Sequence, residues 1–292
     1  MANNLHRPLV IYHGGCADGA GAALAAYLVF GEDAEYRPAV HVDPVPPTDA
    51  EVRGRIVCIL DFSYSREVIE RLQRAALHVL VIDHHKTAAE RLAGIPGFVI
   101  EVDRSGAALA WRELIGGSIP DLIRYIEDRD LWRWQLPNSR QVSAALAARG
   151  AHRDFRLLKT IYENWEAEYA NLVAEGAALV RLERQHVTRM ARSAEPVSIE
   201  GASALATNAT AFHSEVGDEL AAQASIGITW TWDGRRRVYI VSLRSTGTVD
   251  VSEIAVKFGG GGHRKAASFV CELLPWTARI GAPINEEVEH AA

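Results

Sequence analysis

Cysteine is scarce in this sequence, and long apolar runs are absent from it. The 292 residues contain three widely spaced cysteines, Cys16, Cys58 and Cys271, with no C-x-x-C pair. This pattern suggests neither a disulfide framework nor a structural zinc ribbon. The longest apolar stretch, residues 20–30, is well short of the roughly 20 residues that span a bilayer. No signal peptide precedes the first apolar segment, so we expect a cytoplasmic protein without a membrane partner.

Positive charge is also limited. The chain has 31 basic and 37 acidic residues and a net charge of −6, which argues against a protein that coats long duplex nucleic acid. All but four of the basic residues are arginines, which can bind a phosphate through two N–H groups at once. A short anionic substrate is therefore compatible with the composition. With 48% hydrophobic and 23% charged residues, the chain is typical of a folded protein rather than a disordered one.

Strand-like apolar runs alternate with helical patterns in the first half of the chain. They follow one another at residues 9–12, 20–30, 56–60, 66–76 and 79–82. This alternation predicts an α/β fold with a mainly parallel sheet flanked by helices. The continuous apolar runs VCIL and VLVI are typical of strands buried on both faces.

The length of the chain favours two domains. A charged, amphipathic stretch ends at Pro196, and Asp233-Gly234 beyond it predicts a hairpin turn among strand-forming residues. We therefore predict a first domain over residues 1–150, a linker of one or two helices over 151–196, a smaller α/β domain over 197–285 and a tail over 286–292.

Polar clusters follow three of the predicted strands and one helical stretch. They are residues 13–18, Asp61, residues 83–85 and residues 128–130. Ligands of open α/β sheets bind where strands end, although an aspartate there is often only a helix cap or turn residue. Together the clusters supply imidazole and carboxylate groups, which suit manganese, zinc or iron better than calcium.

The triplet Asp83-His84-His85 has two interpretations. In the first, the triplet caps the helix that begins near Thr87. In the second, one imidazole binds a metal, the other imidazole binds substrate phosphate, and Asp83 orients one of the rings.

Four segments in the first half resemble, in order and spacing, the four motifs of the DHH phosphoesterases. They are YHGGCADGAGAA (12–23), LDFSYS (60–65), VIDHHKT (81–87) and EDRDLWRW (127–134). Three later segments look like the DHHA1 substrate-binding domain that accompanies the DHH domain: AFHSEVGDELA (211–221), VSLRSTGTVDVSEIA (241–255) and FGGGGHRKAASF (258–269). The pattern is most similar to the branch that includes bacterial oligoribonucleases, or nanoRNases. The resemblance implies a catalytic, metal-binding DHH domain over residues 1–150 and a DHHA1 domain over 197–285.

The resemblance also implies a centre of two divalent metal ions, commonly Mn²⁺, with Zn²⁺, Fe²⁺ or Mg²⁺ as alternatives. Asp61 would bridge both ions, and His13 would serve one of them. The other ion would be held by Asp61 together with Asp18, His84 and Asp130. Asp130 is preferred to Asp128 because it directly precedes Leu-Trp-Arg-Trp, and Asp128 is expected at the surface. The catalytic set implied in this way is Asp61, Asp83, His84 and His85, with Asp83 supporting the centre and His85 contacting substrate.

Cys16 departs from the pattern of the family. Members usually have an aspartate two residues before the Asp-Gly of the first motif, and this sequence has Cys16 there. A thiolate is a softer ligand than a carboxylate, so Cys16 either favours zinc or iron or leaves this metal position weakly occupied. The alternative is that Cys16 is a small buried filler.

Glycines 259–262 precede a histidine in the predicted second domain. Bare glycine backbone can approach a ligand closely and turn its N–H groups towards an anion, although such a run is more often a loop or bulge. His213 either lines the cleft or is structural. The resemblance assigns substrate binding to Arg244, Gly260, Gly261, Gly262 and His263.

Four tryptophans lie in two alternating pairs. Trp132 and Trp134 would either stack on nucleotide bases or belong to the core, and we favour a core position for one of them. Trp230 and Trp232 lie in a predicted strand and are expected to pack in the second domain or lie on its surface.

The resemblance implies hydrolysis of a phosphodiester by a metal-activated water, with no protein nucleophile. The preferred substrate is short RNA, degraded to mononucleotides. Alternatives with the same chemistry are linear or cyclic dinucleotides and the 3'-phosphate of a nucleotide 3',5'-bisphosphate. A nucleotide-binding regulatory protein whose activity is impaired by Cys16 is a further alternative, and a homodimer is one of the assemblies left open.

Overall fold

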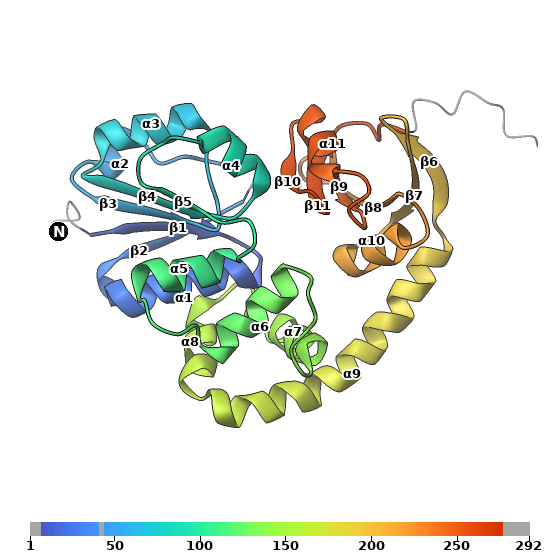
Figure 1. The fold of residues 1–292 in the computed structure, drawn as a ribbon, viewed down its shortest axis with the longest axis horizontal. Helices are drawn as coiled ribbons and strands as arrows, with labels where there is room; N and C mark the ends of the chain where they lie inside the picture. Colours follow the sequence, from blue (N-terminus) through green and yellow to red (C-terminus); the bar gives the residue numbers. More distant parts are fainter. Residues whose placement is uncertain (1–6, 41–43, 277–292) are drawn as a thin grey trace, which may run out of the picture. The chain divides into compact units, whose positions relative to one another are not determined.

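The computed structural model describes residues 7–40 and 44–276. The chain divides into two compact units, Met1–Glu183 and Arg184–Ala292, each with its own sheet (Figure 1). The division falls within the long helix α9 (Trp165–Arg192), which follows α8 (Phe155–Glu163) in the segment expected to form a helical linker. The predicted tail at 286–292 and the end of the predicted second domain, 277–285, lie outside the described residues.

The first unit is built on a five-stranded parallel sheet. Its strand order is β2-β1-β3-β4-β5, and every neighbouring pair is parallel. The strands are β1 (Leu9–His13), β2 (Glu35–Ala39), β3 (Ile56–Leu60), β4 (His78–Asp83) and β5 (Phe98–Ile100). The prediction of a parallel sheet flanked by helices is confirmed.

Alternate side chains of the central strands enter two different hydrophobic cores. In β1, Leu9 and Ile11 point to one core and Val10 and Tyr12 to the other, and all four are buried. This alternation follows from the two-residue period of a strand, and burial on both faces explains the continuous apolar runs. Figure 1 shows α3 (Arg66–Ala75) and α4 (Lys86–Leu92) on one face of the sheet and α1 (Ala17–Phe30) and α5 (Gly106–Leu114) on the other.

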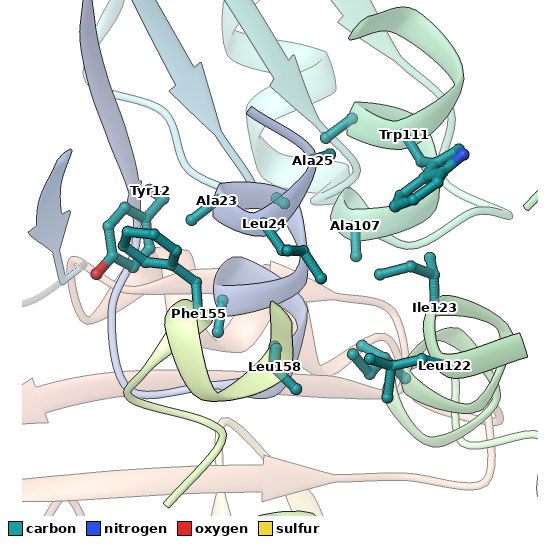
Figure 2. Close-up of a cluster of buried hydrophobic side chains, with 14 of the residues drawn as sticks. Tyr12, Ala23, Leu24, Ala25, Ala107, Trp111, Leu122, Ile123, Phe155 and Leu158 are labelled. Carbon is teal, nitrogen blue, oxygen red and sulfur yellow. The ribbon is translucent and has the colours of Figure 1, made fainter. Parts of the chain in front are cut away.

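Small residues let α1 approach its neighbours closely. A side chain on Gly19 would collide with the backbone oxygen of His13, and one on Gly21 would press on Ala107 of α5. Figure 2 shows Leu24 of α1 among side chains from α5, α6 (Asp121–Asp130) and α8, including Trp111, Ile123 and Leu158. Because α1 can pack this tightly, its first turn lies directly beside the end of β1.

The second unit contains a six-stranded mixed sheet. Its strand order is β10-β11-β9-β8-β7-β6, and of its neighbouring pairs only β7 and β8 run parallel in the described chain. The strands are β6 (Glu195–Ile199), β7 (Ala202–Asn208), β8 (Ile226–Asp233), β9 (Val238–Arg244), β10 (Gly261–His263) and β11 (Ala266–Cys271). Helices α10 (His213–Ala221) and α11 (Val251–Lys257) complete the unit. The hairpin predicted at Asp233-Gly234 joins β8 to β9.

None of the described helices combines the length and the apolarity that crossing a membrane requires.

Candidate metal centre

Parallel register brings three polar chain segments to one edge of the first sheet. Tyr12 of β1 lies opposite Leu60 of β3, and Leu60 lies opposite Ile82 of β4. The residues that follow these three, one position further along each strand, are His13, Asp61 and Asp83. Since parallel strands end at the same edge, residues separated by 48 and 22 positions in sequence arrive side by side there.

Asp61 is the centre of this group. Its backbone has a positive φ of 53°, an uncommon conformation for a residue other than glycine, and its N–H donates to the carbonyl of Ile82 at 2.8 Å. The turn buries the carboxylate and directs its oxygens to two different imidazoles. Oδ2 lies 3.4 Å from His13 Nδ1, and Oδ1 lies 3.2 Å from His84 Nε2.

His13, Cys16 and Asp61 form the first group of side chains with the spacing of metal ligands. Cys16 Sγ lies 3.2 Å from His13 Nδ1 and 3.5 Å from Asp61 Oδ2. The same sulfur accepts the N–H of Gly19 at 3.2 Å and thereby caps the start of α1. Cys16 therefore has polar partners on three sides, and the interpretation of this residue as a buried filler is wrong.

Asp18, Asp61 and His84 form the second group. His84 Nε2 lies 3.6 Å from Asp18 Oδ2 and 3.6 Å from Asp130 Oδ2, so Asp130, the last residue of α6, adjoins this group. Asp61 belongs to both groups and also to a third, which it forms with Asp83 and His85. The structure thus brings together, around one shared carboxylate, the six residues that the sequence singled out as metal ligands: His13, Cys16, Asp18, Asp61, His84 and Asp130.

The N-terminus of α5 holds Asp18 in place. The sequence did not predict this contact. The N–H of Gly106 donates to Asp18 Oδ2 at 2.6 Å and that of Ala107 to Oδ1 at 3.0 Å. Partial positive charge at a helix N-terminus stabilises such a carboxylate. Gly106 also lies against Asp61, because a Cβ at this position would be 2.5 Å from Asp61 Oδ1. The available signal was Ser105-Gly106, a capping serine followed by a glycine at the first helical position.

Asp83 positions the other histidine of the triplet. Its Oδ1 accepts the backbone N–H of His84 at 2.7 Å and of His85 at 3.2 Å, and it lies 2.7 Å from His85 Nδ1. A carboxylate at Nδ1 fixes that proton and leaves Nε2 as the nitrogen directed elsewhere. His85 is the N-cap residue of α4 but makes no side-chain cap bond. The arrangement therefore matches an oriented imidazole better than a helix cap.

Asp128 is buried, so the expectation that it lies at the surface is wrong. Only 5% of the residue is exposed, and its carboxylate accepts the backbone N–H groups of Gln135 at 2.9 Å and Leu136 at 3.3 Å. These bonds fix the loop that leaves α6. Glu127, which the sequence reasoning also missed, accepts from Arg104 Nε at 2.6 Å and from the N–H of Ser105 at 3.2 Å. Two acidic residues next to Asp130 therefore hold backbone in place.

Crowding of buried charges shifts the pKa values of the centre. Burial alone would lower the pKa of His84, but contacts with Asp61, Asp130 and Asp18 raise it to about 10. Burial alone would raise the pKa of Asp61, but the imidazoles of His13 and His84 hold it well below its usual range. Burial, together with the charges of Asp61 and Asp130, raises the pKa of Asp18 well above normal. Such opposed shifts are typical of functional sites.

The donor set fits divalent cations. Asp61 Oδ1 is buried and accepts no hydrogen bond within residues 7–40 and 44–276, although His84 Nε2 lies within ion-pair distance. Carboxylates outnumber imidazoles around it, so the group as a whole attracts positive charge. Carboxylate and imidazole ligands suit manganese, zinc or iron.

The glycine run of the second unit is shaped by packing. The N–H of Gly259 donates to Val256 O and that of Gly260 to Ala255 O, so these two amides close the C-terminus of α11. The expectation that the amides of the glycine run face an anion does not hold for these two. A Cβ on Gly260 would lie 2.0 Å from the backbone oxygen of Ser268, and one on Gly262 would lie 2.6 Å from that of Ala266. Gly261, Gly262 and His263 form the short strand β10. The absent side chains thus allow β10 to approach β11.

Arg244 ends β9 beside α10. Its Nη2 donates to Ser214 Oγ at 2.6 Å and its Nη1 to the carbonyl of Leu243 at 2.9 Å. Burial and the charge of Arg244 lower the pKa of His213, the first residue of α10. The structure therefore places Arg244 beside the start of α10, close to His213.

The two tryptophan pairs differ in their surroundings. The rings of Trp132 and Trp134 meet edge to face at 5.1 Å, with Arg129 over the first and Arg140 over the second. Neither ring belongs to the hydrophobic core of the described first unit, so the prediction of a core position for one of them is wrong: both pack against arginines at a loop. In the second unit, Trp230 is half-buried and Trp232 is exposed, as expected.

A five-stranded parallel sheet with carboxylates and imidazoles at one edge, followed by a six-stranded mixed sheet, resembles the fold of DHH-domain proteins. The DHH domain of a protein assigned to a family of ribosomal proteins has a TM-score of 0.59 and 14% identity, over 91% of this chain and 82% of that one. RecJ from Thermus thermophilus, solved with Mn²⁺, has a TM-score of 0.52 and 16% identity, over 90% of this chain and 49% of that one. The resemblance to DHH proteins noted in the sequence is therefore confirmed.

Two relatives are similar in sequence over most of the chain. An uncharacterised protein of Acanthamoeba polyphaga mimivirus is 27% identical over 89% of this chain and 66% of its own length. The oligoribonuclease NrnB of Bacillus subtilis is 26% identical over 86% of this chain and 69% of its own length. The chain thus spans about two thirds of the length of these relatives. No model of a known protein family matches it. Together the similarities support the resemblance to DHH proteins.

Proposed function

We propose that this protein is a metal-dependent phosphoesterase that hydrolyses short oligoribonucleotides to mononucleotides. The observation that carries the proposal is the position of Asp61, whose two carboxylate oxygens face two separate groups of metal-ligating side chains. A carboxylate shared in this way is suited to bridging two cations. Mn²⁺ is the preferred ion, because carboxylates dominate the second group and because RecJ, with the same fold, has been solved with Mn²⁺.

The protein's own side chains would divide the work around these ions. The chemistry that two such ions supply is activation of water for attack on phosphorus and stabilisation of charge on the attacking and leaving oxygens. His85, held through Nδ1 by Asp83, would direct Nε2 to a phosphate oxygen. Asp18, fixed by the N–H groups of Gly106 and Ala107, would keep one oxygen ligand in a constant position. Preorganised groups of this kind cost no rearrangement during the reaction.

Two observations favour short RNA as the substrate. The oligoribonuclease of B. subtilis is similar over 86% of this chain. In addition, a protein with a net charge of −6 would repel the part of a long nucleic acid that extends beyond the site. In the second unit, His263 and Arg244 are proposed to bind phosphate or the terminal nucleotide through charge-assisted hydrogen bonds. Dinucleotides and nucleotide 3',5'-bisphosphates need the same metal chemistry, so the substrate must be determined by direct comparison.

A substrate panel tests the proposal. Purified protein in Mn²⁺ would be incubated with labelled RNA from dimer to decamer, linear and cyclic dinucleotides, and adenosine 3',5'-bisphosphate, with an Asp61→Asn variant as control. We expect the shortest RNAs to be converted to mononucleotides fastest and the control to be inactive. Turnover of another compound alone would contradict the assigned substrate. Nucleotide binding without turnover in Mn²⁺, Mg²⁺, Zn²⁺ or Fe²⁺ would contradict enzymatic function and favour a regulatory role.

A further inference from the structure

Of the groups of side chains that share Asp61, the group formed with His13 and Cys16 contains sulfur. Cys16 Sγ lies 3.2 Å from His13 Nδ1 and 3.5 Å from Asp61 Oδ2, and the last two atoms are 3.4 Å apart. The group around His84 consists of one imidazole and carboxylates. The two proposed metal positions therefore offer different donor atoms: nitrogen, sulfur and oxygen at one, and nitrogen with several oxygens at the other.

The spacing of the first group fits one face of a tetrahedron. With metal–ligand bonds of about 2.0–2.3 Å, two ligands at a tetrahedral angle lie about 3.3–3.7 Å apart. Adjacent oxygen ligands in an octahedral magnesium site, at about 2.0–2.1 Å from the ion, lie only about 2.9 Å apart. The observed separations of 3.4 and 3.5 Å lie within the tetrahedral range, the separation of 3.2 Å lies just below it, and all three exceed the octahedral value. The arrangement thus suits a four-coordinate ion that has three protein ligands and one further position for water or substrate.

The surroundings of Cys16 also suit a thiolate ligand. The N–H of Gly19 donates to Sγ at 3.2 Å, and Cys16 stands at the N-terminus of α1, a helix of 14 residues. Both the N–H group and the helix terminus stabilise negative charge on sulfur. In the metal-free chain burial outweighs them and raises the pKa of Cys16 to about 11, so binding of a cation to this sulfur would release its proton. The remaining cysteines differ: Cys58 is buried within β3, and Cys271 lies at the end of β11 in the second unit.

We propose that Cys16 is a metal ligand and that the His13–Cys16–Asp61 position selects Zn²⁺ over Mn²⁺. The inference rests on the proposed two-metal function. Thiolate with imidazole is a donor pair that zinc prefers, whereas carboxylate-rich sites suit Mn²⁺ and Mg²⁺. The centre would then hold two different ions, Zn²⁺ beside Cys16 and Mn²⁺ or Mg²⁺ beside His84, with Asp61 between them.

Cobalt substitution tests for the sulfur ligand without relying on activity. Co²⁺ bound to a thiolate gives a sulfur-to-cobalt charge-transfer absorption, and four-coordinate Co²⁺ gives stronger visible bands than six-coordinate Co²⁺. We expect both features in the unmodified protein and in a Cys271→Ser control, and loss of the charge-transfer band in Cys16→Ser. Serine can still cap α1, so this variant keeps the structural role of Cys16 and removes only the sulfur.

Two further measurements complement the cobalt spectrum. Sites of nitrogen, oxygen or sulfur ligands generally bind Zn²⁺ more tightly than Mn²⁺, so in dialysis against both ions we expect the ratio of bound Zn²⁺ to bound Mn²⁺ to be higher in the unmodified protein than in Cys16→Asp. Bound Zn²⁺ should also protect Cys16 from alkylation, whereas Mn²⁺ should protect it less.

Cobalt binding without a charge-transfer band, or alkylation of Cys16 at the same rate with and without Zn²⁺, would overturn the sulfur assignment. Turnover of short RNA under those conditions would leave the proposed function standing, so the two failures are distinguishable. A charge-transfer band that persists in Cys16→Ser would place the sulfur ligand elsewhere and would likewise overturn the inference.

Discussion

Ionisable groups in the first unit are buried beside one another, whereas the candidate substrate residues of the second unit lie partly exposed near strand ends. Asp18, Asp61 and His84 are each at most 2% exposed. Their positions depend on strand register and on the start of α5. His263 lies on the short strand β10, which glycines allow to approach β11. The first unit therefore holds charged groups in fixed positions, whereas the second presents backbone and half-exposed side chains.

We therefore expect substitutions in the first unit to lower kcat and substitutions in the second unit to weaken substrate binding. The largest effect is expected for Asp61→Asn. Asparagine tolerates the positive φ at this position but cannot bridge two cations as a carboxylate does. We expect the protein to fold and kcat to fall by roughly 10³-fold, the loss seen when one group that stabilises transition-state charge is removed. Circular dichroism would verify folding, and near-normal kcat would contradict the role of Asp61.

Gly106→Ala tests whether backbone packing sets the geometry of the centre. The added Cβ would lie 2.5 Å from Asp61 Oδ1 and would displace that carboxylate. Overpacking of this kind costs about 1–3 kcal/mol of stability, and we expect kcat and metal affinity to fall roughly 10–100-fold, as when a group that orients a ligand is lost. Gly234→Ala, where the added Cβ meets only ordinary contacts, is the matched control. Equal kinetics for both variants would show that the contact with Asp61 is unimportant.

His263→Ala tests the other side of the comparison. If His263 binds substrate phosphate, its loss should raise KM by roughly 10–100-fold, the value of one hydrogen bond to a charged group, while kcat and metal content change little. His78→Ala, at an exposed position where β4 begins, serves as control. A fall in metal content for His263→Ala would show that the second unit takes part in holding the ions.

The smallest effect is a dependence of metal-free stability on pH. The pKa of His84 is raised from 6.5 to about 10 in the folded chain. The folded state therefore binds more protons than the unfolded state between these values, and stability falls as pH rises through that window. Urea unfolding of the metal-free protein at pH 6 and pH 9 should show a larger decrease in stability than the same measurement on His84→Gln. Equal decreases would mean that the charge pairing around His84 contributes nothing.

The sequence predicted the centre where local patterns were sufficient. Apolar runs such as VCIL and VLVI identified buried parallel strands, and because such strands end together, His13, Asp61 and Asp83 could be expected at one edge. The contact between Asp18 and Gly106 could not be predicted, since the two residues are 88 positions apart and are joined by the packing of α1 on α5. Asp128 was misplaced for a related reason. Its carboxylate accepts hydrogen bonds from the backbone of a loop, and the conformation of a loop cannot be predicted from hydrophobic periodicity.

Anomalous diffraction from crystals loaded with Zn²⁺ and Mn²⁺ together would show whether two cations share Asp61. We predict two metal peaks about 3.5–4 Å apart, the separation of two-metal sites, both within bonding distance of Asp61. A single metal peak, or two peaks of which neither lies within bonding distance of Asp61, would contradict the proposed two-metal centre.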